Sequence, residues 1–592
     1  MGTLSKIKFL LIIIIGIVAI IFSIQRSNES NIFKYDGASY YSYLPELFIY
    51  HDLGFHFAPK LEEHSHRQIP LGSTGTGSCI PKMTMGISIL ILPFFLTAHL
   101  IVEIFGLNAD GYSFPYMLAV YVASLFYIVV GLYTLRKQLM EYYSEKISDG
   151  VILIIALGTN LFNYAFAEPT MTHNYLFFLF VMFLILTIKW HKSPSIKNSV
   201  FLGLITGIIT LIRPSDVIII IFFLFYGITN KDAIRDKINL IFKNIKFLLI
   251  SLLFFILIIS FQLIYWKIFG GKYFIDTYST EHFFFDNPHI LDGLFGFRKG
   301  WFIYTPVMLL IVPGIYFLLK SYKQFGKAVF IYLILTIYII FSWWCWWYGG
   351  SFGCRSIVES YALFSLPLAE SLFNLKGNTK RIILIVFIPF CILLNLFQTY
   401  QFLTGSLHYE SMTWKAYCTS FGRTKIDSRY IEALKVPDTE YAILGMDERR
   451  GSISRFPYLK EIQRWKINII ASNGKYVSAD FSKEGALVAN RTDAKEWETF
   501  QLIRFEYDKC FFQAINNNFI SSDLNWSNKL FANRPMASGW ELFSIIDLGK
   551  NQCLIKDFQG NFIEYDSISC ALVGATRNFS RKQIFTLVDA KN

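Results

Sequence analysis

The stretch Arg381–Leu403, "RIILIVFIPFCILLNLFQTYQFL", divides the chain into two parts of different composition. This apolar run is long enough to cross the hydrocarbon core of a bilayer, which takes about 20 residues in a helix. Runs of similar length recur before it, and none follows it. The sequence therefore predicts a polytopic α-helical membrane domain over residues 1–403 and a second part outside the membrane.

The composition supports a membrane protein. The 592 residues are 54% hydrophobic, 18% aromatic and 17% charged, and the mean hydropathy is +0.41, above the usual range of soluble globular chains. The formal charge is +12, but Lys and Arg fall in short clusters between apolar runs, which is typical of orientation signals and argues against nucleic-acid binding. The eight cysteines show no spacing of a disulfide framework or a zinc site.

The basic clusters predict the topology. They occupy residues 136–146, 189–197, 230–246, 320–327 and 376–381, as expected of cytoplasmic loops. The first apolar run, 9–24, follows Lys6 and Lys8 and has no small-residue cleavage site, so we interpret it as an uncleaved anchor with a cytoplasmic N-terminus. Alternation then places the other loops outside; these are residues 25–113, 167–173, 213–216, 270–301 and 343–355.

The loops alternate as predicted only if the run 85–107 does not cross the membrane completely. It contains Pro93, His99 and Glu103, which favours a re-entrant or surface-lying helix. The alternative is a full span, compensated by one fewer crossing between residues 198 and 229. Either way we expect about eleven spans and an external C-terminus.

The tail carries a threefold repeat. Residues 404–464 are polar and mixed and are interpreted as a packed connector, and the repeat begins at Trp465. Two sets of similar residues recur at intervals of 43 positions: Tyr476, Phe519 and Phe562, and Arg491, Arg534 and Arg577. A third set, Phe500, Phe543 and Phe585, follows the same interval except that its last member is one position early. Short alternating runs separated by Asn and Gly turns predict strands, and three copies predict an all-β domain, a β-trefoil, over residues 465–592.

The repeated pattern of Asn-Gly, aromatic, Leu-x-Ala and Trp-Glu-x-x-Phe resembles the fascin-like trefoils over about the last 130 residues. The third copy lacks the Trp-Glu pair. Core and turn positions explain the repeated residues without any ligand. A trefoil outside a membrane often binds sugar or protein, so carbohydrate binding is expected of the domain as a whole.

The first external loop opens with "KYDGASYYSYLPELFIYHDLGF", residues 34–55. Asp36 lies just outside the first apolar run, where a helix cap or a solvated loop acid is the alternative to a functional role. Tyr40 and Tyr41 offer flat amphipathic surfaces for sugar rings or for the membrane interface. Gly37 would let the backbone approach a ligand.

An ordered set of segments extends over the first 400 residues or so. It consists of "KMTMGISILILPFF" (82–95), "AEPTMTHNYLFF" (167–178), "LIRPSD" (211–216), "FRKGWFIYTP" (297–306) and "WWYGGSFGCR" (346–355). This set resembles the bacterial branch of the GT-C superfamily of multi-span glycosyltransferases, which includes protein O-mannosyltransferases and aminoarabinose transferases. All segments except the first run into or out of a predicted external loop. The resemblance implies a bacterial cytoplasmic (inner) membrane protein with its trefoil outside.

The GT-C resemblance also implies a chemistry. A carboxylate in the first external loop acts on the acceptor, and the donor is a sugar on a polyprenyl phosphate. Asp36 matches that position. Many family members have two adjacent acids there, whereas this chain has no further acid until Glu46 and Asp52.

These observations predict the roles of ten residues. Asp36 is the expected base for the acceptor hydroxyl. The donor phosphate is expected to contact Arg298, Lys299 and Arg355. The expected substrate-binding residues are Tyr40, Tyr41, Asp52, Glu168, His173 and Arg213. The alternatives are headgroup snorkelling for Lys299, an ion pair of Arg213 with Asp216 between span ends, and a structural role for His173.

The sequence therefore predicts an inverting glycosyltransferase that moves a sugar from polyprenyl phosphate to an external glycan, lipid or protein acceptor. No obligatory metal or cofactor is expected, because the leaving group has a single phosphate to neutralise. One alternative is a transporter or flippase of lipid-linked sugars, for which internal inverted repeats would be typical. The other is a non-catalytic, membrane-anchored sugar-binding protein.

Overall fold

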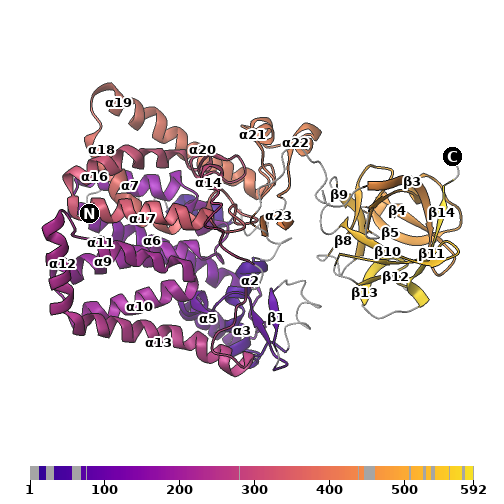
Figure 1. The fold of residues 1–592 in the computed structure, drawn as a ribbon, viewed down its shortest axis with the longest axis horizontal. Coiled ribbons are helices and arrows are strands. Elements are labelled where there is room, and N and C mark those ends of the chain that lie inside the picture. Colours follow the sequence, from indigo (N-terminus) through magenta and orange to yellow (C-terminus); the bar gives the residue numbers. More distant parts are fainter. Residues whose placement is uncertain are drawn as a thin grey trace. The chain divides into compact units, whose positions relative to one another are not determined.

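The structure is a computed structural model. It describes residues 13–21, 32–56, 69–74, 76–278, 281–437, 439–443, 445, 461–483, 485–505, 509–523, 529–534, 541–558, 561–567, 569–576 and 581–590. The chain forms two compact units, Met1–Glu448 and Arg449–Asn592 (Figure 1).

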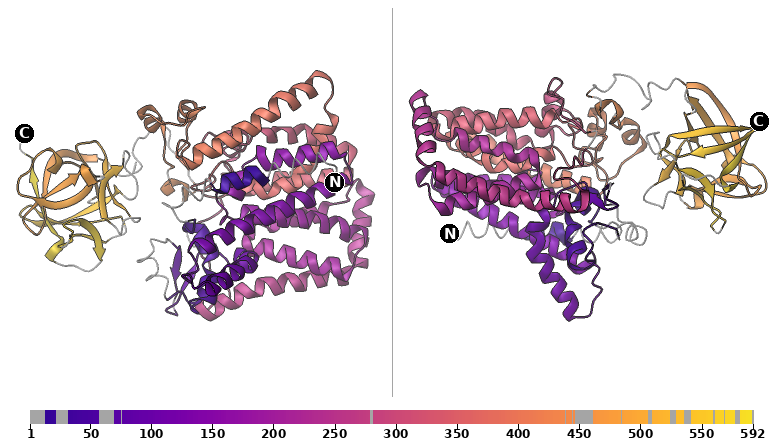
Figure 2. Two further views of the ribbon diagram at one scale, coloured as in Figure 1. Left: turned by 180° about the vertical axis from the view of Figure 1, so that it is seen from behind. Right: turned by 60° about the horizontal axis from the view of Figure 1, so that its bottom comes forward.

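The first unit is helical, and in both views of Figure 2 most of its helices run side by side. Its longer helices are α5 (Gly86–Ile104), α6 (Phe114–Met140), α7 (Glu145–Gly158), α9 (His173–Lys192), α10 (Ile196–Ile212), α12 (Lys231–Lys243), α13 (Ile245–Gly270), α16 (Ile311–Ser321), α17 (Lys323–Phe341), α18 (Tyr361–Asn374) and α20 (Ile388–Leu403). Its short helices are α2 (Tyr35–Tyr41), α3 (Tyr43–Phe48), α8 (Leu161–Phe166), α11 (Ile220–Phe225), α14 (Ile290–Phe295), α15 (Trp301–Tyr304), α19 (Gly377–Ile382), α21 (Trp414–Ser420), α22 (Ser428–Ala433) and α23 (Thr439–Ile443).

Six helices in the described part of the chain are long and apolar enough to cross a membrane: Gly86–Ile104, Phe114–Met140, His173–Lys192, Ile245–Gly270, Lys323–Phe341 and Gly377–Leu403. Three shorter apolar helices are Ile196–Ile212, Pro214–Phe225 and Pro306–Ser321. The predicted class, a multi-pass helical membrane protein, is confirmed at this level, while the number of about eleven spans stays a prediction. The segment expected to be re-entrant forms one helix of 19 residues, α5, with Pro93 inside it.

Two glycines on α10 bring α13 close. A Cβ atom on Gly203 would lie 2.2 Å from the carbonyl oxygen of Ser251, and one on Gly207 would lie 2.8 Å from Cβ of Ile258. Such spacing of small residues lets two helix backbones approach in a membrane. The rest of α13 keeps an apolar surface exposed, with only 11% of its most apolar window buried, as expected of a helix that faces lipid.

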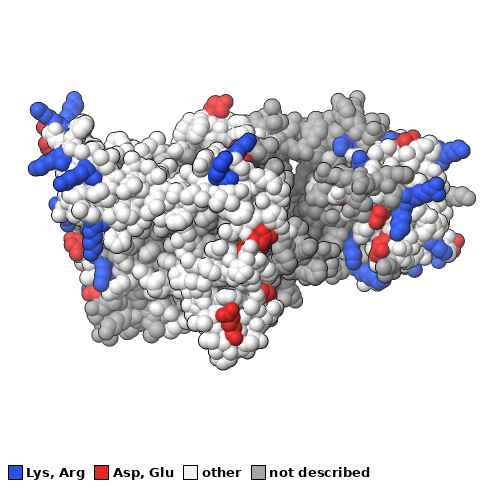
Figure 3. All heavy atoms as spheres, turned by 90° about the horizontal axis from the view of Figure 1, so that it is seen from below, with Lys and Arg blue, Asp and Glu red and all other residues white. Residues whose placement is uncertain are grey.

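Basic side chains are concentrated at one end of the helical unit. On the face that Figure 3 shows, most Lys and Arg side chains of this unit gather at its left end, where Figure 1 places α12. The short elements α2, α3 and β1 (Leu71–Ser73), which pairs with β2 (Cys79–Pro81), lie at the opposite end. The segment predicted to be the first external loop and α12, which lies in a predicted basic loop, are therefore at opposite ends of the bundle.

The described residues of the second unit form twelve strands in one sheet. The strands are β3 (Glu461–Ile470), β4 (Tyr476–Asp480), β5 (Ala486–Arg491), β6 (Thr499–Phe505), β7 (Lys509–Gln513), β8 (Phe519–Asp523), β9 (Lys529–Arg534), β10 (Phe543–Gly549), β11 (Gln552–Lys556), β12 (Phe562–Tyr565), β13 (Leu572–Thr576) and β14 (Ile584–Asp589). Six of them close a ring, in which β3 pairs with β6, β6 with β7, β7 with β10, β10 with β11, β11 with β14 and β14 with β3. The others form three hairpins, β4–β5, β8–β9 and β12–β13. The predicted all-β domain is confirmed as a barrel of three four-strand units.

The repeated residues occupy equivalent positions in these units. Tyr476, Phe519 and Phe562 each begin the first strand of a hairpin. The fully buried Phe500, Phe543 and Phe585 lie in β6, β10 and β14. Arg577, the third predicted arginine, lies outside the described residues. The apolar alternation of each copy thus fills one shared core.

Candidate functional site

Helix α2, which carries Asp36, is fixed from several sides. A Cβ atom on Gly37 would lie only 2.3 Å from Oγ1 of Thr170, so the absence of a side chain lets α2 contact the predicted external turn 167–173. Gly37 therefore allows a close contact with Thr170, while the expected approach of a ligand to this glycine stays a prediction. The hydroxyl of Ser88 donates to the carbonyl oxygen of Tyr40 over 2.6 Å, which holds α2 on α5.

Asp36 forms an ion pair with Arg355. One guanidinium nitrogen, Nη2, lies 3.4 Å from Oδ2 of Asp36. The Asp36 side chain is 31% exposed, and that of Arg355 is 16% exposed. A carboxylate and a guanidinium that are 319 positions apart thus meet where both remain reachable.

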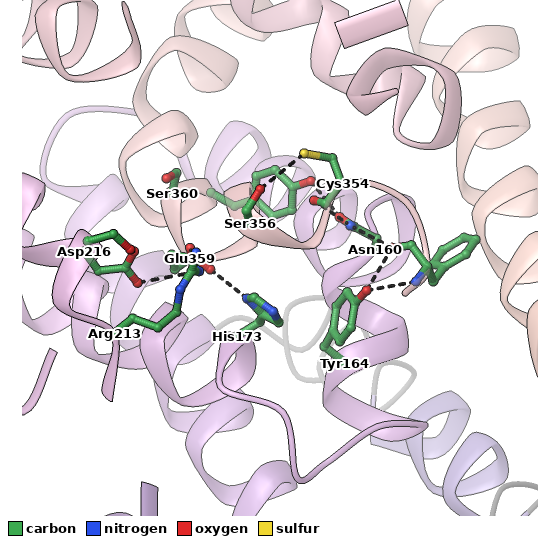
Figure 4. Close-up of polar contacts among 12 residues, drawn as sticks. Asn160, Tyr164, His173, Arg213, Asp216, Cys354, Ser356, Glu359 and Ser360 are labelled. Atoms are coloured by element: carbon green, nitrogen blue, oxygen red, sulfur yellow. Dashed lines mark hydrogen bonds and ion pairs between the residues drawn. The ribbon is translucent and has the colours of Figure 1, made fainter. Parts of the chain in front are cut away.

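The tryptophan-rich turn before Arg355 is held by α8. The hydroxyl of Tyr164 donates to the carbonyl oxygen of Phe352 over 3.0 Å and lies 2.9 Å from its backbone nitrogen. The side chain of Asn160 donates to the carbonyl oxygen of Cys354 over 3.1 Å (Figure 4). Gly353, at φ +60°, makes the left-handed turn that a residue with a side chain adopts rarely. These contacts position Arg355 at the start of the 3₁₀ segment Arg355–Ser360.

A buried network of charges adjoins this pair. Glu359 accepts from Nη1 of Arg213 over 2.7 Å and pairs with Nδ1 of His173 over 3.0 Å. Asp216 lies 3.8 Å from Arg213. In Figure 4 Glu359 lies between Arg213 and His173. Arg355 and Glu359 belong to the same segment, Arg355–Ser360, and the ring of His173 lies 4.9 Å from the ring of Tyr164, which holds the turn before Arg355. The two groups therefore form one cluster.

Glu168 and Lys299 extend the cluster. Burial raises the pKa of Glu168, whereas the charge of Arg355 opposes that shift, and Asn163 donates to its carboxylate over 2.9 Å. Burial lowers the pKa of Lys299 to about 7. The ammonium of Lys299 donates to the carbonyl oxygens of Ser351 and Tyr409, so it fastens the turn that precedes Arg355. Arg298 lies beside it, 5.4 Å from the ring of Trp347.

Tyr40 is buried within the cluster. Burial raises its pKa well above the ordinary value, and the charge of Asp36 adds to the shift, so its phenol is neutral and can donate a hydrogen bond.

Two predicted site residues lie elsewhere. Tyr41 is 1% exposed, stacks on Phe33 and donates to the carbonyl oxygen of Gly111 over 2.6 Å, which makes it part of the helical core. Asp52 pairs with His56 over 2.8 Å, and its backbone nitrogen donates to the carbonyl oxygen of Glu46 on α3 over 2.9 Å. The other eight predicted residues lie in or beside the cluster.

Glu359 is a residue of the cluster that the sequence did not predict. It follows Arg355 by four positions at the start of an apolar helix, so the rule that an ionisable residue at membrane depth is a functional candidate would have found it. Within the described residues, no group of three or more His, Cys, Asp or Glu side chains could hold a metal ion.

The fold and the site define a class: a multi-pass helical unit with a charged cluster at the end away from its basic loops, followed by a β barrel. No protein-family model and no curated protein matches the chain. Among solved structures, the archaeal oligosaccharyltransferase AglB from Archaeoglobus fulgidus, in complex with an inhibitory peptide and a dolichol-phosphate, matches with 12% identity and a TM-score of 0.39. That match covers 78% of this chain and 62% of the archaeal chain.

Two smaller proteins match over the length of one domain. The designed 3-fold symmetric protein ThreeFoil has 10% identity and a TM-score of 0.20, and the match covers 21% of this chain and 99% of that one. SeviL, solved with the asialo-GM1 saccharide, has 11% identity and a TM-score of 0.19 and covers 22% of this chain and 100% of its own.

Proposed function

We propose that the chain is an inverting glycosyltransferase of the GT-C type, which moves a sugar from a polyprenyl phosphate to a glycan, lipid or protein acceptor outside a bacterial cytoplasmic membrane. The observation that carries the proposal is the pair of Asp36 and Arg355, a base and an anion-binding group in one accessible place. In this topology the N-terminus lies in the cytoplasm and the C-terminal domain lies outside.

The reaction needs one proton acceptor and one site for negative charge. Asp36 takes the proton of the acceptor hydroxyl as its oxygen attacks C1 of the sugar. The bond between C1 and the phosphate oxygen breaks, and the phosphate leaves with the electron pair. Arg355 neutralises the phosphate, since one guanidinium group can donate two parallel hydrogen bonds to two phosphate oxygens.

The ion pair suggests an order of events. Without substrate, the carboxylate of Asp36 is paired with the guanidinium of Arg355. A bound donor phosphate competes for the guanidinium and leaves the carboxylate available as the base. Glu359 keeps Arg213 in place nearby, so a second guanidinium can share the charge of the leaving phosphate.

The C-terminal barrel is proposed to be a β-trefoil that binds the carbohydrate of the acceptor. A ring of six strands with three hairpins is the arrangement that a trefoil requires, and the interval of 43 residues supports it. The proposed reaction requires no metal, so transfer is expected to persist in chelator.

The test is a transfer assay with the full-length protein in nanodiscs and a panel of polyprenyl-phosphate sugars. We expect transfer by the wild type and a loss of about 10³-fold or more in Asp36→Asn. The exposed Asp286 lies in another predicted external loop, so Asp286→Asn is a matched control that should keep full transfer.

Full transfer by a correctly inserted Asp36→Asn variant would remove the proposed base. If the wild type turns over no donor, the glycosyltransferase proposal fails, and a transporter of lipid-linked sugars or a non-catalytic sugar-binding protein takes its place.

A further inference from the structure

A second group of polar and aromatic side chains lies beside the cluster and has no part in the reaction proposed above. Glu281 forms an ion pair with the ammonium of Lys82 and accepts from Nε1 of Trp344 over 3.1 Å. The same ammonium lies 4.8 Å from the centroid of the Tyr278 ring. These four residues come from the first loop, the segment after α13 and the tryptophan-rich turn.

The backbone holds these three segments together. Phe283 and Trp343 form an antiparallel bridge, and the backbone nitrogen of Trp344 donates to the carbonyl oxygen of His282 over 3.0 Å. The hydroxyl of Thr277 donates to the carbonyl oxygen of Lys82 over 2.8 Å. The group is therefore arranged before any ligand binds.

Tyr278 connects the group to the reaction site. The hydroxyl of Tyr278 lies 3.3 Å from Sδ of Met83, and the backbone nitrogen of Met83 donates over 3.0 Å to Oγ of Ser39 on α2, the helix that carries Asp36. Burial and then the charge of Asp36 raise the pKa of Tyr278 to about 12, so its phenol stays protonated at neutral pH. A ligand that lies on this group would therefore also lie close to the proposed base.

The chemistry of the group favours a neutral polyol. Lys82 is already paired with Glu281, so an incoming phosphate or uronate would meet a carboxylate and gain no free cation. The two side chains are 28% and 19% exposed, and an ammonium and a carboxylate can still exchange hydrogen bonds with hydroxyl groups. Tyr278 and Trp344 are partly exposed, and an aromatic ring face suits the apolar face of a sugar ring.

We propose that Lys82, Tyr278, Glu281 and Trp344 form a subsite that binds the pyranose ring of a neutral sugar next to Asp36. The placement of that sugar at a reacting centre rests on the proposed function, whereas the binding itself does not. The ring belongs either to the donor or to the acceptor glycan. The opposing explanation is an ion pair that only fastens the segment after α13 to the first loop.

The test uses full-length protein in nanodiscs and methyl glucoside, galactoside and mannoside, each carrying a diazirine. After photolysis and digestion, at least one probe should label peptides that contain residues 281–285 or 343–348. An excess of the unmodified methyl hexoside should compete, and methyl glucuronide should not. Labelling should fall about fivefold or more in Trp344→Leu, because the ring face is lost.

Two variants control for the fold. Trp414 on α21 is 63% exposed and outside the group, so Trp414→Leu should label like the wild type. Trp344→Phe keeps an aromatic face without the N–H donor and should retain at least half of the labelling. Equal labelling of Trp344→Leu and wild type, competition by glucuronide, or label confined to residues 461–590 would overturn the subsite.

Kinetics then separate the two sources of the sugar and the two proposals. A Glu281→Gln variant should raise KM about tenfold for the donor if the ring is the donor's, or for the acceptor if it is the acceptor's, since a hydrogen bond to a charged group is lost. If labelling is as expected but Asp36→Asn transfers fully, the subsite proposal stands and the proposed role of Asp36 fails. If labelling is absent but transfer depends on Asp36, the subsite proposal fails and the proposed reaction stands.

Discussion

The two units of this chain treat charge differently. In the helical unit, both members of the Arg213–Glu359 pair are largely buried, at 15% and 2% exposed. In the β barrel, the equivalent kind of pair joins Glu498, 5% exposed, to Arg491, which is 44% exposed. The barrel pair recurs one repeat later as Arg534 and Glu541, whereas the described residues of the helical unit show no sequence repeat of the Arg213–Glu359 pair.

This difference in burial and repetition distinguishes charged residues that stabilise the fold from charged residues that belong to a functional site. A charge repeated by symmetry is explained by the repeat itself. A buried charge without a counterpart is costly to desolvate and is retained where chemistry needs it. We therefore expect substitutions of matched residues to act strongly on transfer in the helical unit and weakly in the barrel.

After Asp36→Asn, the largest effect on transfer is expected from Arg355→Gln. Removing the guanidinium takes away the group that neutralises the leaving phosphate, so transfer should fall about 10²- to 10³-fold. Arg491→Gln in the barrel should leave the rate unchanged. Transfer rates in nanodiscs measure both variants, and an Arg355→Gln enzyme within tenfold of the wild type would contradict the assigned role.

The next effect concerns stability. Glu359→Gln leaves Arg213 with Asp216 at 3.8 Å as its remaining ion-pair partner, and breaking a buried pair should lower the free energy of unfolding by about 3 kcal/mol. Glu498→Gln should cost about 1 kcal/mol or less, because its arginine is exposed to water. Unfolding in mixed micelles with increasing SDS compares them, and equal losses would remove the distinction between the units.

The sequence predicted the barrel better than the site. The regular interval between Phe500 and Phe543 predicts that both residues occupy the same core position, because each repeat folds locally in the same way. Asp36 and Arg355 were each predicted from their place beside an apolar run, but their contact depends on how the helices pack. The ion pair of Lys82 with Glu281 was missed for the same reason. Hydropathy predicts which segments span the membrane, but it does not predict which loops contact each other.

Glu46 offers a pH-dependent comparison. It is fully buried, neither carboxylate oxygen has a hydrogen-bond partner among the described residues, and burial raises its pKa from 4.5 to about 8. Between these values the folded protein binds more protons than the unfolded chain, so the free energy of unfolding falls as pH rises. The expected slope is roughly 1 kcal/mol per pH unit.

Glu46→Gln should remove that slope and leave the variant more stable than the wild type at about pH 7.5. Glu496 in the barrel is exposed, and Glu496→Gln should change neither the slope nor the stability. SDS titrations at several pH values measure both. A wild-type slope that survives in Glu46→Gln would assign the pH dependence to another group.

The smallest effect is expected from Gly37→Ala. The added Cβ atom would lie 2.3 Å from Oγ1 of Thr170, and a β-branched side chain has little freedom to turn away. Helix α2 must then shift, which moves Asp36 relative to Arg355, and transfer should fall about tenfold because catalysis depends on such placement. The double variant Gly37→Ala with Thr170→Gly should recover most of the rate.

The matched glycine in the barrel is Gly474. It has φ +75° with nothing within 4 Å of an added Cβ atom, so Gly474→Ala strains only its own turn, at a cost of about 1 kcal/mol, and should leave transfer unchanged. Recovery in the Gly37/Thr170 double variant is the informative result. It would locate the defect in the contact between α2 and the turn 167–173, because a ligand displaced from Gly37 would stay displaced when Thr170 is replaced.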